Sequence, residues 1–337
     1  MIHTTALAQR FQTKNEVVEA VRGIDIDVAP GEIVAFLGPN GAGKSTTLRM
    51  LTTLLPPTSG AATVAGFDIV SQQVEVRRRI GLIGQGNGSL DGLRVSEELT
   101  LQARLYGIGR KEAHIRAQEL LGELDLDRQA QRDVARLSGG QRRRLDIAMG
   151  LIHRPKLVFL DEPSSGLDPQ SRANLWNHIV RLREQHGITI FLTTHYLDEA
   201  DAVAERVIVI DNGAIIADGT PDQLKTKVEG DLLLVNLCDP GDREAAMSVA
   251  RQLPTSHDVT ADGAVLSLRV GHGDLALPDL VRALDAAGVR MTSTQVRRPS
   301  LDDVFLKLTG RSLRDEAAPH SAPDSGPTDR LQTGGQL

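Results

Sequence analysis

The residues with the clearest chemical meaning form one glycine-rich loop, Gly38-Pro39-Asn40-Gly41-Ala42-Gly43-Lys44-Ser45-Thr46. Glycines allow successive backbone N–H groups to converge on phosphate oxygens, and the N-terminus of a following helix favours anions. In such a loop Lys44 reaches the β- and γ-phosphates and the Ser45 hydroxyl binds Mg²⁺. A buried strand is expected before the loop, and Leu48, Leu51 and Leu55 predict an apolar stripe on the helix after it. We therefore expect nucleotide binding.

Two carboxylates follow a second buried strand, in the segment Leu157-Val158-Phe159-Leu160-Asp161-Glu162. Open α/β sheets bind their ligands at the carboxyl ends of the strands, which is where these acids stand. Asp161 is expected to hold Mg²⁺ through its hydration shell, and Glu162 to orient and deprotonate the attacking water. The alternative is a pair of solvated acids that cap a strand.

Two further polar residues end strands of the same predicted sheet. Gln85 follows the segment IGLIG, and His195 follows ITIFLTT. A single histidine after a strand is usually structural, but His195 shares the strand-end edge with Lys44 and Glu162. The other histidines lack metal-ligand spacing, so zinc is not expected.

A second glycine-rich stretch, Ser138-Gly139-Gly140-Gln141, opens a helix with an apolar face. Its free N–H groups, its hydroxyl and the positive end of the helix make a second anion site. Two explanations remain open from the residues alone. Either the chain binds two nucleotides, or two copies share each nucleotide between one loop and the other. The next residues, Arg142 to Arg144, point three ways on a helix, which favours a solvated face or a subunit contact over nucleic-acid binding.

Composition describes an ordinary globular protein of 337 residues. Its 38 basic and 44 acidic side chains give a formal charge of −6, which provides no global basic field for nucleic acid or anionic lipid. The single cysteine, Cys238, fits a reducing compartment. The N-terminus lacks a leader pattern, and no apolar run approaches the ~20 residues needed to span a bilayer. We expect a chain without a membrane span of its own.

The strands and helices that must position these residues indicate an α/β fold. Through residue 220, short apolar strands alternate with helical patterns, which predicts a parallel sheet. Buried strands are expected at Ile33–Leu37, Ile80–Gly84, Leu157–Leu160 and Ile188–Thr193. A hairpin is expected between Val207–Ile210 and Ala214–Ala217.

An antiparallel part is expected near the N-terminus, where Ile24, Ile26 and Val28 alternate with Asp25 and Asp27. Residues 86–135 contain helical patterns with no strand between them, which predicts a helical insertion.

From about residue 223 a second strand and helix pattern begins, and it ends in the short helix SLDDVFLKLTG. We therefore predict a nucleotide-binding domain at residues 1–222, with a helical subdomain at about 86–150. A small α/β domain is predicted at 223–310 and a disordered tail at 311–337.

Taken together, these motifs resemble an ATP-binding cassette (ABC) ATPase, a P-loop NTPase fold, over residues 1 to about 220. The matching segments are GPNGAGKST, Gln85, LSGGQ, LVFLDEP, SGLD at 165–168, and His195. The segment RRPSLDDVFLKLTGR at 297–311 further resembles the C-terminal part of antibiotic-exporter ATPases of the daunorubicin-resistance type.

The resemblance implies a head-to-tail homodimer in which Ser138, Gly139, Gly140 and Gln141 contact the ATP held by the partner's first loop. It further implies that Gln85 senses Mg²⁺ and the attacking water, and that His195 contacts the γ-phosphate. Asp168 then lies at the dimer seam, and Phe11 stacks on adenine.

The resemblance also implies that the helical insertion docks on a separate integral-membrane permease, at the cytoplasmic face of the membrane. The function expected is ATP-driven export of a hydrophobic, antibiotic-like compound, with no nucleic-acid partner. Transport of lipid, polysaccharide, heme or ions is the alternative, followed by a soluble ABC ATPase that works on ribosomes or DNA. One cassette and no sustained heptads argue against that last class.

Overall fold

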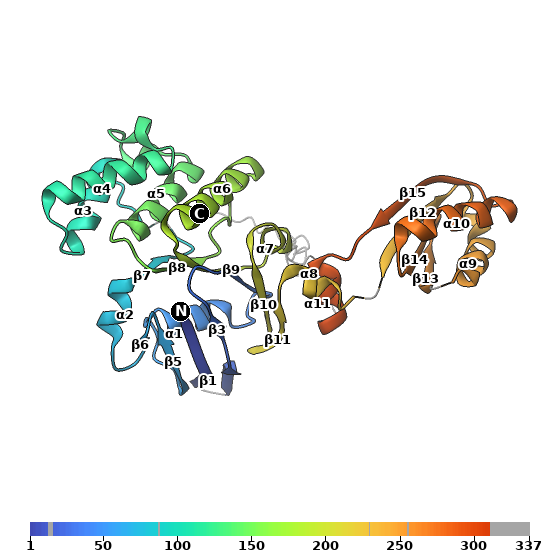
Figure 1. The fold of residues 1–337 in the computed structure, drawn as a ribbon, viewed down its shortest axis with the longest axis horizontal. Coiled ribbons are helices and arrows are strands. Elements are labelled where there is room, and N and C mark those ends of the chain that lie inside the picture. Colours follow the sequence, from blue (N-terminus) through green and yellow to red (C-terminus); the bar gives the residue numbers. More distant parts are fainter. Residues whose placement is uncertain (13–15, 87, 229, 255, 311–337) are drawn as a thin grey trace, which may run out of the picture.

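The computed structural model describes residues 1–12, 16–86, 88–228, 230–254 and 256–310 (Figure 1). The tail predicted to be disordered, 311–337, lies outside the described residues. The described chain forms an N-terminal antiparallel sheet, a central sheet flanked by helices, and a C-terminal sheet that projects away from both.

The central sheet carries the strand ends to which the sequence analysis assigned chemistry. Its order is β11-β10-β4-β9-β8-β7, parallel from β10 to β7, with β11 as the antiparallel partner of β10. The strands are β4 (Ile33–Leu37), β7 (Ile80–Ile83), β8 (Leu157–Asp161), β9 (Thr189–Thr194), β10 (Arg206–Asp211) and β11 (Ala214–Gly219). The predicted buried strands and the predicted hairpin are confirmed. The residues that follow β4, β7, β8 and β9 therefore lie at one edge.

The N-terminal sheet is antiparallel, as expected, but the alternating segment from Ile24 to Val28 is not one continuous strand. Its strands are β1 (Ile2–Gln12), β2 (Val17–Ile24), β3 (Asp27–Val28), β5 (Ser59–Val64) and β6 (Phe67–Asp68). The alternating segment around Ile26 is divided between β2 and β3. The interruption arises because the Asp25 carboxylate accepts a bond from the Ala6 N–H, at 2.7 Å, in place of a strand neighbour. The predicted alternation of buried isoleucine and exposed aspartate nevertheless holds.

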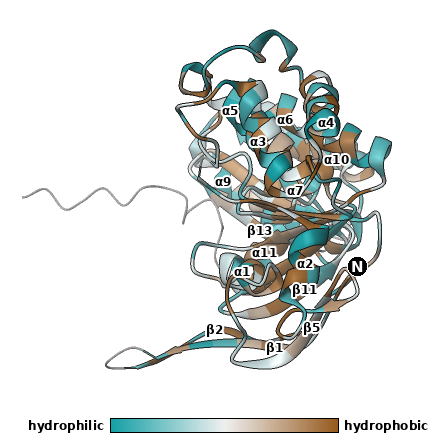
Figure 2. Cartoon of the chain, turned by 90° about the vertical axis from the view of Figure 1, so that its left-hand side faces the viewer, coloured by the Kyte–Doolittle hydropathy of each residue, from teal (hydrophilic) through white to brown (hydrophobic). Residues whose placement is uncertain are grey.

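Helices cover one face of the central sheet around a first apolar core, and the N-terminal sheet with α1 (Lys44–Leu51) and α2 (Gln73–Arg79) covers the other face around a second core; the strands of the central sheet are brown in Figure 2. The helices on the first face are α5 (Gly139–Leu151), α6 (Pro169–His186), α7 (Leu197–Val203) and α8 (Pro221–Lys225). The stripe predicted after the phosphate loop is shorter than expected, because α1 ends before Leu55. The Thr52 hydroxyl donates to the Leu48 carbonyl, and Thr53 adopts a left-handed φ of 62° that stops the helix.

The helical insertion lies between β7 and β8. It contains α3 (Val95–Leu105), α4 (Arg110–Glu123) and short 3₁₀ helices at Asp127–Gln129 and Val134–Arg136, and it leads into α5. Helices α3, α4 and α5 pack on one another around buried Leu99 and Leu121. Helix α5 thus packs with the insertion, and its C-terminal end leads back to strand β8 of the central sheet.

The C-terminal sheet has the order β13-β14-β12-β15 with antiparallel neighbours, a split β-α-β arrangement. Its elements are β12 (Asp231–Leu237), α9 (Arg243–Gln252), β13 (His257–Asp262), β14 (Val265–Val270), α10 (Gly273–Ala286) and β15 (Met291–Arg297), with a 3₁₀ helix at Pro240–Asp242. Strand β13 was not predicted from the sequence. This edge strand exposes Asp258 and Asp262, so it lacks the apolar run of a buried strand.

The last helix, α11 (Leu301–Thr309), contacts both domains: its apolar face packs with the nucleotide-binding domain, and its Asp303 pairs with Arg269 and Arg297 of the small sheet. Its apolar residues Leu301, Val304 and Phe305 are buried in the same core as Leu224 and Val228. Figure 1 places α11 beside α8, at the base of the projecting sheet. The amphipathic spacing of the helix explains this packing, since its apolar face needs an apolar surface to cover it.

Within the described ranges, no helix combines the length and the apolar character that a membrane crossing requires.

Candidate active site

The phosphate loop connects β4 to α1 in a backbone that only glycine tolerates at two positions. A Cβ on Gly38 would lie 2.3 Å from the Ile210 carbonyl oxygen. Gly43 has a φ of 108°, and a Cβ there would lie 2.5 Å from the Ala20 carbonyl oxygen. The loop is therefore locked against the neighbouring backbone, with its N–H groups at the start of α1.

Lys44 is buried inside this loop, with only 4% of its side chain exposed. Its Nζ donates to the carbonyl oxygens of Gly38 at 2.7 Å and Pro39 at 3.0 Å, and lies 3.6 Å from Oε1 of Glu162. The ammonium thus stands between the loop and the acid at the end of β8. This is the position from which a cation neutralises phosphate charge.

Ser45 and Asp161 present hydroxyl and carboxylate oxygens to each other across the site, 3.4 Å apart. Thr193 orients the acid, because its hydroxyl donates to Asp161 Oδ1 at 2.6 Å. The same hydroxyl and the Thr193 carbonyl both accept from the Glu162 N–H at 3.1 Å. Hard oxygen donors in this arrangement fit Mg²⁺, so the donor set and the glycine cradle suit a metal-bound nucleotide.

Glu162 and His195 meet at the ends of β8 and β9. His195 Nδ1 lies 3.2 Å from Glu162 Oε1, and both side chains are largely buried. Glu162 has a left-handed φ of 45°, an uncommon conformation that turns it toward the edge of the sheet. The contact with His195 holds the pKa of Glu162 below its usual value against the effect of burial, and the Lys44 ammonium adds to this lowering. Glu162 is therefore ionised at neutral pH.

Two predicted site residues lie further out. Gln85 follows β7 and is exposed to solvent. Phe11 is in β1, opposite Val18 of β2, and is 40% exposed. Neither is among the hydrogen-bonded groups around Lys44 and Glu162 in the described residues, so their roles stay predictions.

The second glycine-rich stretch begins α5 and bonds to itself. Ser138 is the N-cap: its hydroxyl accepts from the Gln141 N–H, and the Gln141 side chain accepts from the Ser138 N–H. Gly140 lies against α6, because a Cβ there would be 2.9 Å from the Ser171 hydroxyl oxygen. Asp168 caps α6 and accepts from Ser171 N at 2.8 Å. Ser138 and Asp168 are both exposed, at the starts of neighbouring helices.

The three arginines after this stretch are not the solvated or subunit-facing set that we expected. Arg143 is buried, with 7% exposure, and donates to the carbonyls of Gly84 at 2.6 Å and Pro163 at 2.7 Å. Arg142 bonds to Ser89, and Arg144 to the carbonyl of Leu124. Buried carbonyls need donors, and a guanidinium supplies several at once. Arg143 thus joins α5 to the segments that carry Gln85 and Glu162.

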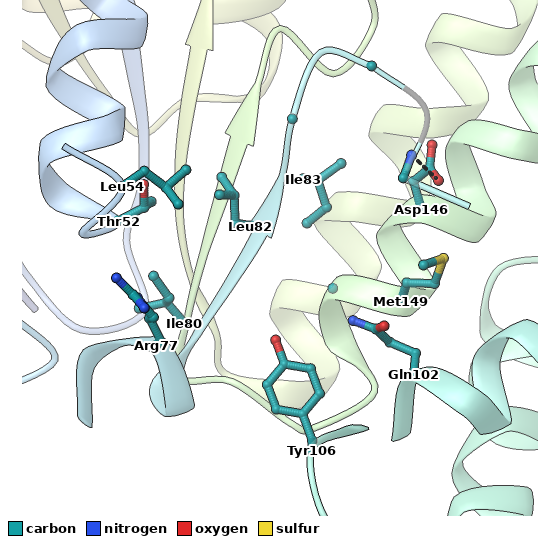
Figure 3. Close-up of a pocket in the computed structure, with 14 residues that line it drawn as sticks. Thr52, Leu54, Arg77, Ile80, Leu82, Ile83, Gln102, Tyr106, Asp146 and Met149 are labelled. Carbon is teal, nitrogen blue, oxygen red and sulfur yellow. Dashed lines mark hydrogen bonds between the residues drawn. The ribbon is translucent and has the colours of Figure 1, made fainter. Parts of the chain in front are cut away.

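A groove beside Gln85 opens between the end of β7 and helices α3 and α5, with a volume of about 370 Å³. Figure 3 shows Leu54, Leu82 and Tyr106 around it, from three different segments. Leu54 is 62% exposed, and the Tyr106 ring stacks on His153 at a centroid distance of 3.9 Å. The groove therefore presents apolar surface next to a predicted site residue.

This fold and this strand-end constellation define an ABC-type P-loop ATPase, and comparison with known proteins agrees. The ABC transporter family matches residues 21–165, and the C-terminal domain of DrrA1-3-like ATP-binding proteins matches residues 219–309. The chain belongs to the ATP-binding proteins of ABC transporters, within the daunorubicin- and doxorubicin-resistance group.

Individual relatives cover most of the chain. It is 44% identical to the daunorubicin resistance ATP-binding protein DrrA3 of Streptomyces coeruleorubidus, over 89% of this chain and 94% of the relative. It is 36% identical to the linearmycin resistance ATP-binding protein LnrL of Bacillus subtilis (strain 168), over 88% and 95%. Among solved structures, the dimeric bacterial ABC transporter cassette MJ0796 matches with a TM-score of 0.60 and 26% identity, over 65% of this chain and 98% of that one.

Proposed function

We propose that this chain is the ATP-hydrolysing subunit of an efflux transporter, and that it powers export of a hydrophobic, antibiotic-like compound through a separate permease. The observation that carries this proposal is the identity of 39–44%, over most of the chain, to proteins named for resistance to daunorubicin or doxorubicin. The chain's own site supplies the chemistry.

Hydrolysis would use residues that already lie together. Ser45 and Asp161 would hold Mg²⁺, which neutralises phosphate charge when it is bound. Lys44 would bind the β- and γ-phosphates. Glu162, ionised and turned to the sheet edge, would orient the attacking water and accept its proton, while His195 would donate to the γ-phosphate.

The second glycine-rich stretch supports a homodimer. In one chain, the side chains of Ser138 and Gln141 bond to each other's backbone N–H groups, at a helix N-terminus suited to an anion. A second copy, turned head to tail, would place its ATP against Ser138–Gln141. Asp168, exposed beside this stretch, would then lie at the seam. One relative of known structure is described as dimeric.

The groove beside Gln85 is the proposed docking site of the permease, at the cytoplasmic face of the membrane. Exposed Leu54, Leu82 and Tyr106 would bury apolar surface against a short helix of the partner. Gly84 and Gly86, which flank Gln85, line the same groove. Movement of the partner would therefore reach Gln85 directly.

The test is export by intact cells that carry the chain and the multi-span membrane protein that co-purifies with it in mild detergent. Cells with both proteins are expected to lose preloaded daunorubicin, a fluorescent probe, faster than cells with the Glu162→Gln variant. Recovery of the chain with ribosomes or DNA, and equal probe retention by both cell lines, would contradict the proposal.

A further inference from the structure

One buried carboxylate outside the site described above joins three of the segments around it. Glu199, in the first turn of α7, is 4% exposed, and both of its carboxylate oxygens have partners. Oε1 accepts a hydrogen bond from the Ser164 hydroxyl and lies 3.4 Å from Nε of Arg172. Oε2 accepts from the Thr194 hydroxyl at 3.1 Å. A carboxylate this deeply buried is stable because its oxygens are satisfied.

The two hydroxyl partners belong to the segments that carry the proposed catalytic pair. Ser164 comes two residues after Glu162, beyond the end of β8, and Thr194 directly precedes His195 at the end of β9. Glu199 therefore spans the same gap that Glu162 Oε1 and His195 Nδ1 span at 3.2 Å. Ser164 and Thr194 are themselves buried, so the span has little freedom to relax.

The third partner of Glu199 fixes the other side of His195. The Arg172 guanidinium lies 4.5 Å from the centroid of the Tyr196 ring, and that ring packs on the His195 ring at 4.0 Å. Tyr196 N also donates to the Thr194 hydroxyl at 2.9 Å. The residues on both sides of His195 are thus held by contacts that converge on one carboxylate.

We propose that Glu199 is a positioning residue for ATP hydrolysis, which sets the separation of Glu162 and His195 by fastening Ser164 to Thr194. The inference rests on the roles proposed above for Glu162 and His195. Glu199 acts through its reach between two hydroxyls. A glutamine preserves that reach, since its oxygen accepts from Ser164 and its amide can donate to Thr194. An aspartate preserves the charge but is one methylene shorter.

The experiment measures kcat and KM for ATP hydrolysis by the purified full chain and its variants. Glu199→Asp and Glu199→Ala are expected to lower kcat about 100-fold, the effect of misplacing a catalytic group by roughly 1 Å. Glu199→Gln should keep kcat within about fivefold of wild type, because a neutral hydrogen-bonded span survives. KM for ATP should stay unchanged in all three variants, since Glu199 does not contact the phosphate loop.

Glu205→Gln is the matched control. Its carboxylate also joins α6 to the sheet, through Arg183 and the Ile33 N–H, but at the opposite ends of the strands. This variant should retain the wild-type kcat. Full activity in Glu199→Asp with loss in Glu199→Gln would overturn the inference, because charge and not reach would then matter.

A double variant separates this inference from the proposed site. In a His195→Ala background, Glu199→Ala should lower kcat by much less than it does in the wild-type chain, because there is no longer a Glu162–His195 separation for Glu199 to set. Multiplied losses in the double variant would overturn the inference. Wild-type hydrolysis by both Glu162→Gln and His195→Ala would instead show that the proposed catalytic pair is wrong, whatever the Glu199 variants do.

Discussion

The two glycine-rich loops of the ATPase domain are built in opposite ways. The loop at residues 38–46 is locked against β10 and β2, and its Lys44 is buried among carbonyls and Glu162. The stretch at 138–141 is exposed at Ser138 and Gly139, half-buried at Gly140 and Gln141, and capped by its own side chains. The first loop is complete within one chain. In the described residues, no hydrogen bond joins it to the second stretch, whose N–H groups are hydrogen-bond donors. The homodimer proposed above, in which each site is divided between two copies, predicts this asymmetry.

The sharpest test of this comparison replaces Glu162, the acid beside the loop at residues 38–46. Glu162→Gln is expected to lower kcat by about 10³-fold, the scale of a lost general base, while ATP still binds. Because hydrolysis would then no longer reopen the dimer, ATP should shift the variant to dimer, as measured by light scattering. Turnover at the wild-type rate would remove Glu162 from the role of base.

A pair of glycine substitutions contrasts the two loops directly. Gly43→Ala places a Cβ 2.5 Å from a carbonyl at a left-handed φ, so it should destabilise folding by about 2–4 kcal/mol in urea unfolding. Gly139→Ala meets no atom closer than 4.0 Å and should leave stability and ATP affinity unchanged. It should still lower hydrolysis, because the added methyl would face the partner's nucleotide. Equal behaviour of the two variants would refute the contrast.

Loss of a helix N-cap should have a smaller effect, which can be measured at both α5 and α11. Ser138→Ala and Ser300→Ala remove equivalent capping boxes, from α5 and α11, and each should cost about 1 kcal/mol of unfolding free energy. Only Ser138→Ala should also reduce ATP hydrolysis. Equal loss of hydrolysis in both variants would remove Ser138 from the nucleotide site.

The smallest expected effect is a pH dependence of folding stability that arises from Glu162, beside the loop at residues 38–46. Because the folded-state pKa of Glu162 lies below its ordinary value of 4.5, its contacts stabilise the fold above that value. The stabilisation is lost as the pH falls through the folded-state pKa. Urea unfolding of wild type and Glu162→Gln should therefore converge in acid. A constant difference between them from pH 7 to pH 3 would contradict this assignment.

Much of the site could be predicted because strand ends of a parallel sheet meet at one edge. Lys44, Asp161, Glu162 and His195 each follow an apolar strand, and they lie together as expected. Other contributors carry no local signal. Thr193 lies within an ordinary apolar strand, and Arg143 within a run of like residues. Only the tertiary structure reveals that Thr193 donates to the Asp161 carboxylate and Arg143 to the Pro163 carbonyl.

The fold, like the site, has elements that were predictable from the sequence and elements that were not. Long apolar strands such as β4 and β9 were predictable because burial on both faces leaves a continuous pattern. The edge strand β13 was not, because its exposed aspartates resemble a loop. The packing of α11 on α7 and α8 was not predictable, since the pattern gives an amphipathic helix but not the surface that covers it.

The return of α11 also constrains the order in which the protein can be completed. Leu301, Val304 and Phe305 fill part of the ATPase core, yet a ribosome adds them only after the whole projecting sheet has been made. Until they are added, Leu224 and Val228 lack this part of the core in which they are buried. Synthesis that stops after β15 would thus leave both domains without their contacts to α11, although every residue at the nucleotide edge had already been translated.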